Sequence, residues 1–151
     1  MKSGLHLPRG HFRLDVFDHD AGRVVEVVDE PNTIVRGART AHARLLGGDT
    51  AGRTVTKIGF GQGGLATNTA MTSLTSAYIK ALSVAGYGTY SVQFAFSLAT
   101  NEFNGGVIRE FGLIMGNGLL YARKSRGDDG LIKTSNMSLN GSWTIEFPDG
   151  F

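Results

Sequence analysis

The chain has 151 residues, 22 of them glycine and none cysteine, with a formal net charge of +2. This length predicts one domain, 1–151, with a core that needs no disulfide or metal. The lack of cysteine excludes disulfide scaffolds, thiolate metal sites and cysteine nucleophiles. A hydrophobic share of 41% excludes a disordered chain, and the glycine content argues against a helical bundle.

The charges are nearly balanced, with 15 Lys and Arg against 13 Asp and Glu. The densest basic run, residues 123–126, is followed at once by Asp128 and Asp129, whereas a nucleic-acid-binding protein concentrates basic residues on one face. No stretch has the length of a membrane span, and the N-terminus has no apolar signal segment. We therefore expect synthesis in a cytoplasm, with neither a membrane nor a nucleic acid as partner.

The first third of the chain predicts a hairpin followed by a helix. Residues 10–28 alternate apolar and polar side chains on either side of a turn at 18–22, and we expect Pro31 to end the pairing. Residues 32–46 predict the only long helix, with Asn32 as its N-cap. Its apolar face is expected at Ile34, Ala38, Ala41 and Leu45, and its outer face at Arg36, Arg39 and Arg44.

The rest of the chain predicts β-strands. Residues 90–98 alternate strictly, and the Asn-Gly turn at 116–118 predicts a tight hairpin between its two flanking strands. We expect a bulge or bend at Asn140 and Gly141, inside the last strand. The other strands are expected at residues 54–60, 77–82, 107–115, 119–124 and 137–147. The predicted fold is α+β and β-rich: an antiparallel β-sandwich with one amphipathic helix packed on it.

A glycine-rich segment at residues 59–64 matches the G-x-G-x-x-G pattern of dinucleotide-binding proteins and follows a predicted strand. The next residues lack an amphipathic helical face, and Lys80 stands about where an acidic ribose ligand would be needed. A nucleotide-binding protein that uses this loop is therefore an alternative function, against a plain glycine turn or a subunit contact. We expect no cofactor.

Two further clusters of polar residues carry side chains that chemical sites use. Asp18, His19 and Asp20 carry metal-ligand side chains, but three adjacent residues at a hairpin tip predict a solvated turn. Arg109 and Glu110 interrupt an apolar strand, which fits a general acid or, more simply, an ion pair at an edge or interface. We predict no catalytic residue, no metal site and no enzymatic activity.

An ordered series of segments resembles the N-terminal baseplate-attachment module of phage tail fibres, which also occurs in small virion proteins of tailed bacteriophages. Its centre is IREFGLI at 108–114, the turn at 116–118 and LLYAR at 119–123. Upstream, LLGG at 45–48 and VTKIGFGQGG at 55–64 match a helix end, a strand and a loop. Downstream, IKT at 132–134 and SLNGSWTIEF at 138–147 match the closing strand. The resemblance covers about 32–147 and leaves out the hairpin.

The resemblance implies a structural component of a virion, made and assembled in the cytoplasm of a bacterial host. Its partners would be other virion proteins of the tail, baseplate, fibre or capsid. A protein that attaches or adapts tail fibres is the first expectation; a capsid-decoration or head–tail joining protein is the alternative, and a DNA-binding head-completion protein a third. Fibre modules are commonly trimeric, so a homo-oligomer, with a trimer first, is expected. The candidate interface consists of Gln62, Gly63, Gly64, Thr67, Asn68, Arg109 and Glu110.

Overall fold

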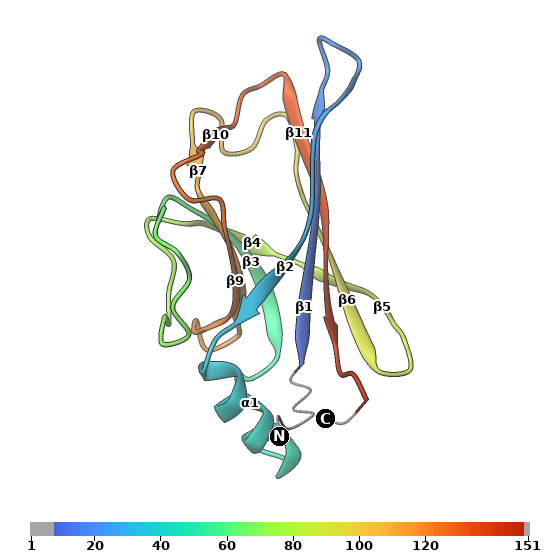
Figure 1. The fold of residues 1–151 in the computed structure, drawn as a ribbon, viewed down its shortest axis with the longest axis vertical. Helices are drawn as coiled ribbons and strands as arrows, with labels where there is room; N and C mark the ends of the chain where they lie inside the picture. The colour runs from blue at the N-terminus through green and yellow to red at the C-terminus, as the bar shows by residue number, and fades with distance from the viewer. Residues whose placement is uncertain (1–7, 150–151) are drawn as a thin grey trace, which may run out of the picture.

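The structure is a computed structural model that describes residues 8–149 (Figure 1). These residues form one α-helix and eleven β-strands. In chain order the elements are β1 (Arg9–Asp18), β2 (Arg23–Ile34), α1 (Gly37–Leu46), β3 (Val55–Gly61), β4 (Tyr78–Ala81), β5 (Ser83–Tyr87), β6 (Ser91–Leu98), β7 (Val107–Ile108), β8 (Glu110–Met115), β9 (Leu120–Ser125), β10 (Leu131–Ile132) and β11 (Met137–Glu146). The β-rich α+β class predicted from the sequence is confirmed.

Nine strands form one antiparallel sheet in the order β4-β3-β8-β9-β2-β1-β11-β6-β5. Strand β2 joins the two halves of this sheet, because it pairs with β1 along its length and with β9 at Thr33 and Ile34. At the two ends of the sheet lie β4 and β5, which are separated in the chain by Leu82 alone. The sheet therefore curls round on itself and is nearly closed, as a flattened, sandwich-like structure (Figure 1).

The interior between the two halves is filled by aromatic side chains. The ring of Phe12 lies 4.7 Å from that of Phe111, 5.1 Å from Trp143 and 5.7 Å from Phe96, measured between centroids. These rings come from β1, β8, β11 and β6, so both halves of the sheet contribute to one core. The alternation along β1 and β6 places their apolar side chains inward, as the sequence predicts.

The start of the helix differs from the prediction. Helix α1 begins at Gly37, and Asn32 lies inside β2, so Asn32 is not an N-cap. Pro31 does not end the pairing, because it lies opposite His11 in the β1–β2 ladder. A proline is tolerated at this position because β9 pairs with β2 only at Thr33 and Ile34. At Pro31, β2 therefore has β1 as its one neighbouring strand, and the N–H that proline lacks is not needed for a second ladder.

The predicted faces of the helix agree with the structure from Gly37 onward. Ala38 and Ala41 are buried, and α1 contacts β9 at the end of the molecule opposite the β1–β2 turn (Figure 1). The predicted outer residues are all exposed: Arg36, Arg39 and Arg44.

The expected bulge at Asn140 and Gly141 is absent from β11, which keeps continuous register with both β1 and β6 at these two residues. A glycine is needed at position 141 because a Cβ there would overlap the ring of Phe96. The predicted strand 107–115 is divided at Arg109 into β7 and β8, and the short strands β5 and β10 were not predicted.

Candidate functional site

The most connected polar cluster in the described chain is centred on a buried ion pair between Glu110 and Arg123. Nε of Arg123 donates to Oε1 of Glu110 at 2.7 Å, and the two side chains are 1% and 2% exposed, respectively. They come from the adjacent strands β8 and β9. Burial of two charges is costly unless their remaining donors and acceptors are also satisfied, so the surroundings of the pair decide what it does.

The second oxygen of Glu110 holds both ends of the polar loop at residues 62–76. Oε2 accepts the backbone N–H of Gly63 at 2.9 Å and that of Thr75 at 2.7 Å. The N–H of Gln62 also donates to the carbonyl of Thr75, at 2.9 Å. The carboxylate therefore closes the loop at its neck.

The guanidinium of Arg123 holds the first part of the same loop. Nη1 donates to the carbonyl of Leu65 and to Oγ1 of Thr67, each at 2.8 Å, and Nη2 donates to the carbonyl of Gly63 at 3.0 Å. We call the ion pair and the loop groups bonded to it the Glu110–Arg123 anchor. Because every charged atom of the carboxylate and three guanidinium nitrogens are bonded, the anchor meets the condition for a stable buried pair.

Two glycines of the G-x-G-x-x-G segment are required by this anchor. A Cβ on Gly61 would overlap the carboxylate of Glu110, and one on Gly63 would lie 2.8 Å from its Oε2. The glycines therefore let the backbone approach a carboxylate of the same chain. That N–H of Gly63 is the kind of donor that a bound phosphate would need, and here Glu110 already accepts it.

The tip of the loop is also bonded to the body of the domain. The N–H of Arg36 donates to the carbonyl of Thr69 at 2.7 Å, and the N–H of Leu120 donates to that of Thr72 at 3.0 Å. No helix follows the glycine-rich segment within residues 65–77, so the strand–turn–helix context of a dinucleotide site is not present there.

The structure brings most of the predicted interface residues to this loop but divides them by role. Gly63, Thr67 and Glu110 belong to the anchor, and Glu110 is buried. Gly64 and Arg109 lie together beside it, since a Cβ on Gly64 would be 3.3 Å from Cδ of Arg109. Gln62 and Asn68 are exposed.

Sequence reasoning missed Arg123 as the partner of Glu110. It counted Arg123 only as part of a basic run, although Arg123 lies in the LLYAR segment that the resemblance includes. The signal that could have found it was a pair of opposite charges, one in each strand of a predicted apolar hairpin. A charged side chain on a buried strand is costly unless an opposite charge pairs with it.

A second polar cluster lies at residues 99–106 and is more exposed. Nζ of Lys80 lies 2.8 and 2.9 Å from the two carboxylate oxygens of Glu102, and the hydroxyl of Tyr78 donates to Glu102 at 3.1 Å. The backbone N–H of Ala99 donates to the same carboxylate at 2.9 Å. The Ala99 N–H, followed by Lys80, holds the pKa of Glu102 below its ordinary value.

The buried Lys133 also bonds to this loop. Its Nζ donates to Oδ1 of Asn104 at 2.9 Å and to the carbonyl of Thr134 at 3.0 Å. Burial lowers the pKa of Lys133. The groups bonded to Glu102 and Lys133 include the backbone of Ala99 and Thr134 and the side chain of Asn104. This cluster therefore holds the loop at 99–106, as the first cluster holds the loop at 62–76.

The hairpin turn with Asp18, His19 and Asp20 is held by bonds within the turn and to the segment beside it. The N–H of His19 donates to the carbonyl of Asn136 at 2.7 Å, and its Nε2 lies 2.9 Å from Oγ of Ser138. Oδ1 of Asp18 accepts the backbone N–H groups of Asp20 and Ala21, at 2.9 and 3.2 Å. Over residues 8–149 no group of three or more His, Cys, Asp or Glu side chains is placed to hold a metal ion. In this turn His19 and Asp20 are exposed, whereas Asp18 is partly buried.

Among the described residues, no helix has the length and apolar character needed to cross a membrane. No known protein family, curated protein or solved structure matches this chain.

Proposed function

We propose that this protein is a structural component of a tailed-bacteriophage virion, in the tail or baseplate, where it attaches or adapts tail fibres. The observation that carries the proposal is the Glu110–Arg123 anchor. Two parts of the resemblance that are far apart in the sequence meet in it: the glycine-rich segment, with Gly61 and Gly63, and the hairpin at 108–123, with Glu110 and Arg123. Segments that meet in one bonded cluster support a resemblance to one module better than scattered matches would.

The exposed surface supports a role in protein contacts. Leu65, on the anchored loop, is 75% exposed, and Tyr87 and Tyr90, beside the β5–β6 turn, are 79% and 68% exposed. Tyrosine supplies large contact area at low entropic cost and is enriched at interfaces. Virion parts assemble in many symmetric copies, so modest contacts per subunit are multiplied by avidity.

The proposed oligomer is a homotrimer in the particle, and the loop at 62–76 remains its proposed contact. The loop does not need a neighbour to bond the backbone groups of Gln62, Gly63, Thr69, Thr72 and Thr75, because the domain already does so. A subunit contact through this loop would therefore use a preformed surface. Light scattering of the purified protein and cryo-microscopy of particles would measure the copy number.

The direct test is the protein content of virions. Particles released from cells that carry this gene would be purified on a density gradient and analysed by quantitative mass spectrometry. We expect peptides of this chain in intact particles at a fixed ratio to a tail protein, and in tails separated from heads. Presence in the lysate with absence from particles would overturn the proposal; presence in tail-free heads would favour the capsid-decoration alternative.

A further inference from the structure

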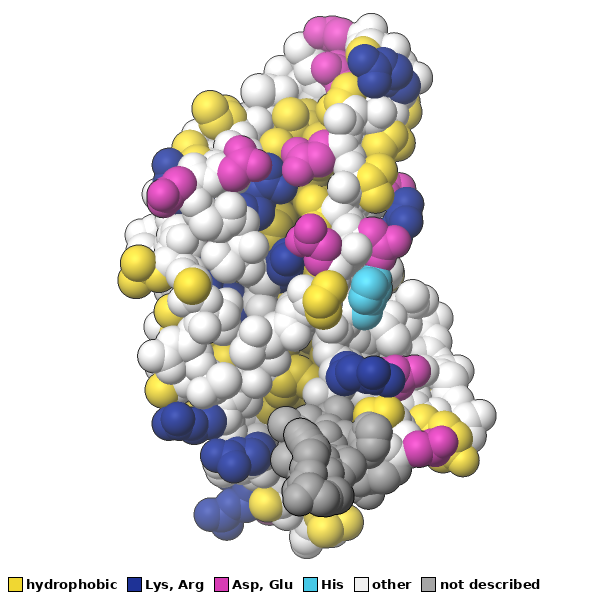
Figure 2. Space-filling view, in the orientation of Figure 1, with side chains coloured by type: hydrophobic (Ala, Val, Ile, Leu, Met, Phe, Trp, Pro, Cys, Tyr) yellow, Lys and Arg dark blue, Asp and Glu magenta, His cyan; other side chains and the backbone are white. Residues whose placement is uncertain are grey.

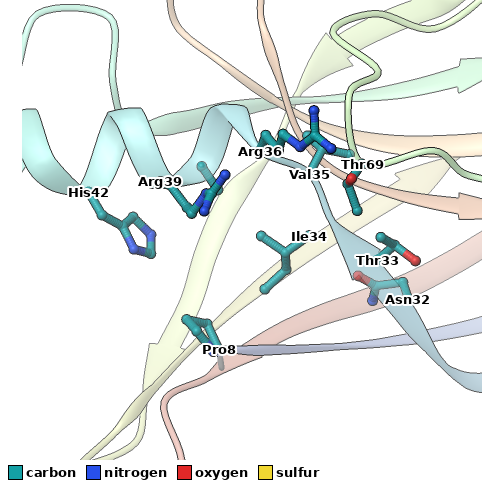
Figure 3. Close-up of a pocket in the computed structure, with 10 residues that line it drawn as sticks. Pro8, Asn32, Thr33, Ile34, Val35, Arg36, Arg39, His42 and Thr69 are labelled. Atoms are coloured by element: carbon teal, nitrogen blue, oxygen red, sulfur yellow. The ribbon is translucent and has the colours of Figure 1, made fainter. Parts of the chain in front are cut away.

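A cavity of about 530 Å³ opens between the start of α1 and the end of β2 (Figure 3). Its lining combines charged, polar and apolar side chains. Arg36 and Arg39 come from the start of the helix and Asn32 and Ile34 from the end of β2, and Ala38 is a further apolar lining residue. A ligand that fits such a wall carries a negative charge beside an apolar group.

The structure gives the side chains of these two arginines no partner among the residues it describes. Within residues 8–149, neither Arg36 nor Arg39 forms a side-chain hydrogen bond or ion pair. Arg44 on the same helix differs, since its Nη1 lies 4.0 Å from Oδ2 of Asp49. Helix α1 contains no acidic residue, and dark-blue basic side chains gather over it in Figure 2. Two unpaired guanidinium groups beside one cavity favour an acidic ligand.

Asn32 adds a second, independent observation. Both polar atoms of its side-chain amide are buried, and neither has a hydrogen-bond partner in the described part of the chain. The side chain lies over Gly10 on β1, where a Cβ would overlap Oδ1. A buried amide without partners costs free energy, and a rotation of this side chain toward the cavity would offer one donor and one acceptor to a ligand.

A peptide group meets both requirements of that amide, since it presents one N–H and one C=O. A fully deprotonated inorganic anion such as sulfate presents acceptors only, and any small inorganic anion would leave the apolar lining residues Ile34 and Ala38 uncovered. The lining of the cavity therefore favours an acidic peptide over a small inorganic anion.

We propose that this cavity binds an acidic peptide segment of a partner protein. A Glu or Asp carboxylate of that segment bonds to Arg36 and Arg39, a neighbouring apolar side chain packs on Ile34 and Ala38, and the main chain bonds to Asn32. The inference rests on the cavity alone and does not depend on the proposed virion role.

The test uses the full chain labelled with ¹⁵N and two probe peptides, acetyl-Leu-Glu-Leu-Glu-amide and its Gln counterpart, acetyl-Leu-Gln-Leu-Gln-amide. We expect saturable shifts of the backbone amides of residues 32–39 and of the Asn32 side-chain NH₂ with the Glu peptide. The Gln peptide should bind at least about tenfold more weakly, because it cannot form the charge-assisted bonds.

Variants of exposed arginines supply the matched controls. R36Q/R39Q should weaken binding of the Glu peptide at least about tenfold, whereas R44Q, on the same helix but outside the cavity, should leave it unchanged. The dispersion of the amide spectrum verifies that each variant is folded.

Three results would overturn the proposal. The first is the absence of saturable shifts at residues 32–39, and the second is equal binding by the R36Q/R39Q variant. The third is binding of inorganic phosphate, or of a short DNA duplex, at these residues as tightly as the Glu peptide, which would identify a general anion site or a nucleic-acid site.

Discussion

The loops at residues 62–76 and 99–106 are both held by a glutamate and a basic residue, yet the two anchors differ in burial. The Glu110–Arg123 pair is 1–2% exposed, while the side chains of Lys80 and Glu102 are 26% and 24% exposed. Water can replace a lost partner at the second pair but not at the first. The same pairing of charges is therefore expected to stabilise the fold to very different degrees.

The largest expected effect comes from breaking the buried pair. Arg123→Met leaves the Glu110 carboxylate buried without its cation and should lower the free energy of unfolding by about 3–5 kcal/mol. Lys124→Met, at the next residue, removes a cation whose partner Glu30 is 58% exposed, and it should cost less than about 1 kcal/mol. Urea denaturation followed by Trp143 fluorescence measures both. A loss below about 1 kcal/mol for Arg123→Met would contradict the role given to the anchor.

A glycine that touches the anchor should be nearly as sensitive. Gly63→Ala places a Cβ 2.8 Å from Oε2 of Glu110 and 3.0 Å from Oγ1 of Thr75, so one of them must move. We expect a loss of about 1–3 kcal/mol, measured by thermal or urea denaturation. Gly86→Ala is the control, because Gly86 has nothing within 4 Å of the added Cβ, and it should gain about 0.4–1 kcal/mol. Equal effects at the two glycines would contradict the close approach.

The more exposed anchor should contribute less and should depend on pH. Glu102→Gln is expected to cost about 1 kcal/mol or less at pH 7. The pKa of Glu102 is lowered in the folded protein, so the unfolded chain binds more protons in the acid range and stability rises with pH there. The contribution is complete above the ordinary pKa of 4.5 and is lost as the pH falls through the lower folded value.

This pH dependence can be measured as the difference in unfolding midpoint between wild type and Glu102→Gln from pH 3 to pH 7. The difference should be greatest near pH 7 and should shrink toward pH 3. A difference that grows on acidification would show that the direction of the pKa shift is wrong.

The smallest effect is expected on the outer face of β1. Nη1 of Arg13 lies 3.2 Å from Oδ2 of Asp29, and the two side chains are 47% and 49% exposed. Solvent screens such a pair, so Arg13→Gln should leave the unfolding midpoint unchanged within error. If Arg13→Gln shifts the unfolding midpoint as much as Glu102→Gln does, solvent exposure does not determine how much each ion pair contributes to stability.

The sequence predicted the elements with strong periodicity and missed those fixed by distant contacts. Strict alternation located β6, and the Asn-Gly turn located the β8–β9 hairpin. The start of α1 was predicted too early, because Asn32 is a good N-cap but lies in a strand that continues past Pro31. No local pattern marks β5 or β10, which are short strands that depend on their partners.

The candidate site was predicted in part for the same reason. The glycines at 61–64 and Glu110 stood out as local irregularities, but the partner Arg123 is 13 residues beyond Glu110 and the loop groups that they bond are still farther away. Sequence spacing does not specify which charged side chains meet inside a sheet. The structure supplies that pairing, and with it the reason for Gly61 and Gly63.

The Glu110–Arg123 anchor holds the loop at 62–76 from within the same chain. Amide hydrogen exchange of wild type and Glu110→Gln, measured by NMR under native conditions, tests it most directly. We expect the N–H groups of Gly63 and Thr75 to be protected in wild type, because both donate to Oε2 of Glu110. In the variant they should exchange at least about tenfold faster, while Phe94 and Phe96 in β6 keep their protection. Fast exchange of Gly63 and Thr75 in the wild-type protein, or no change in the variant, would contradict the claim.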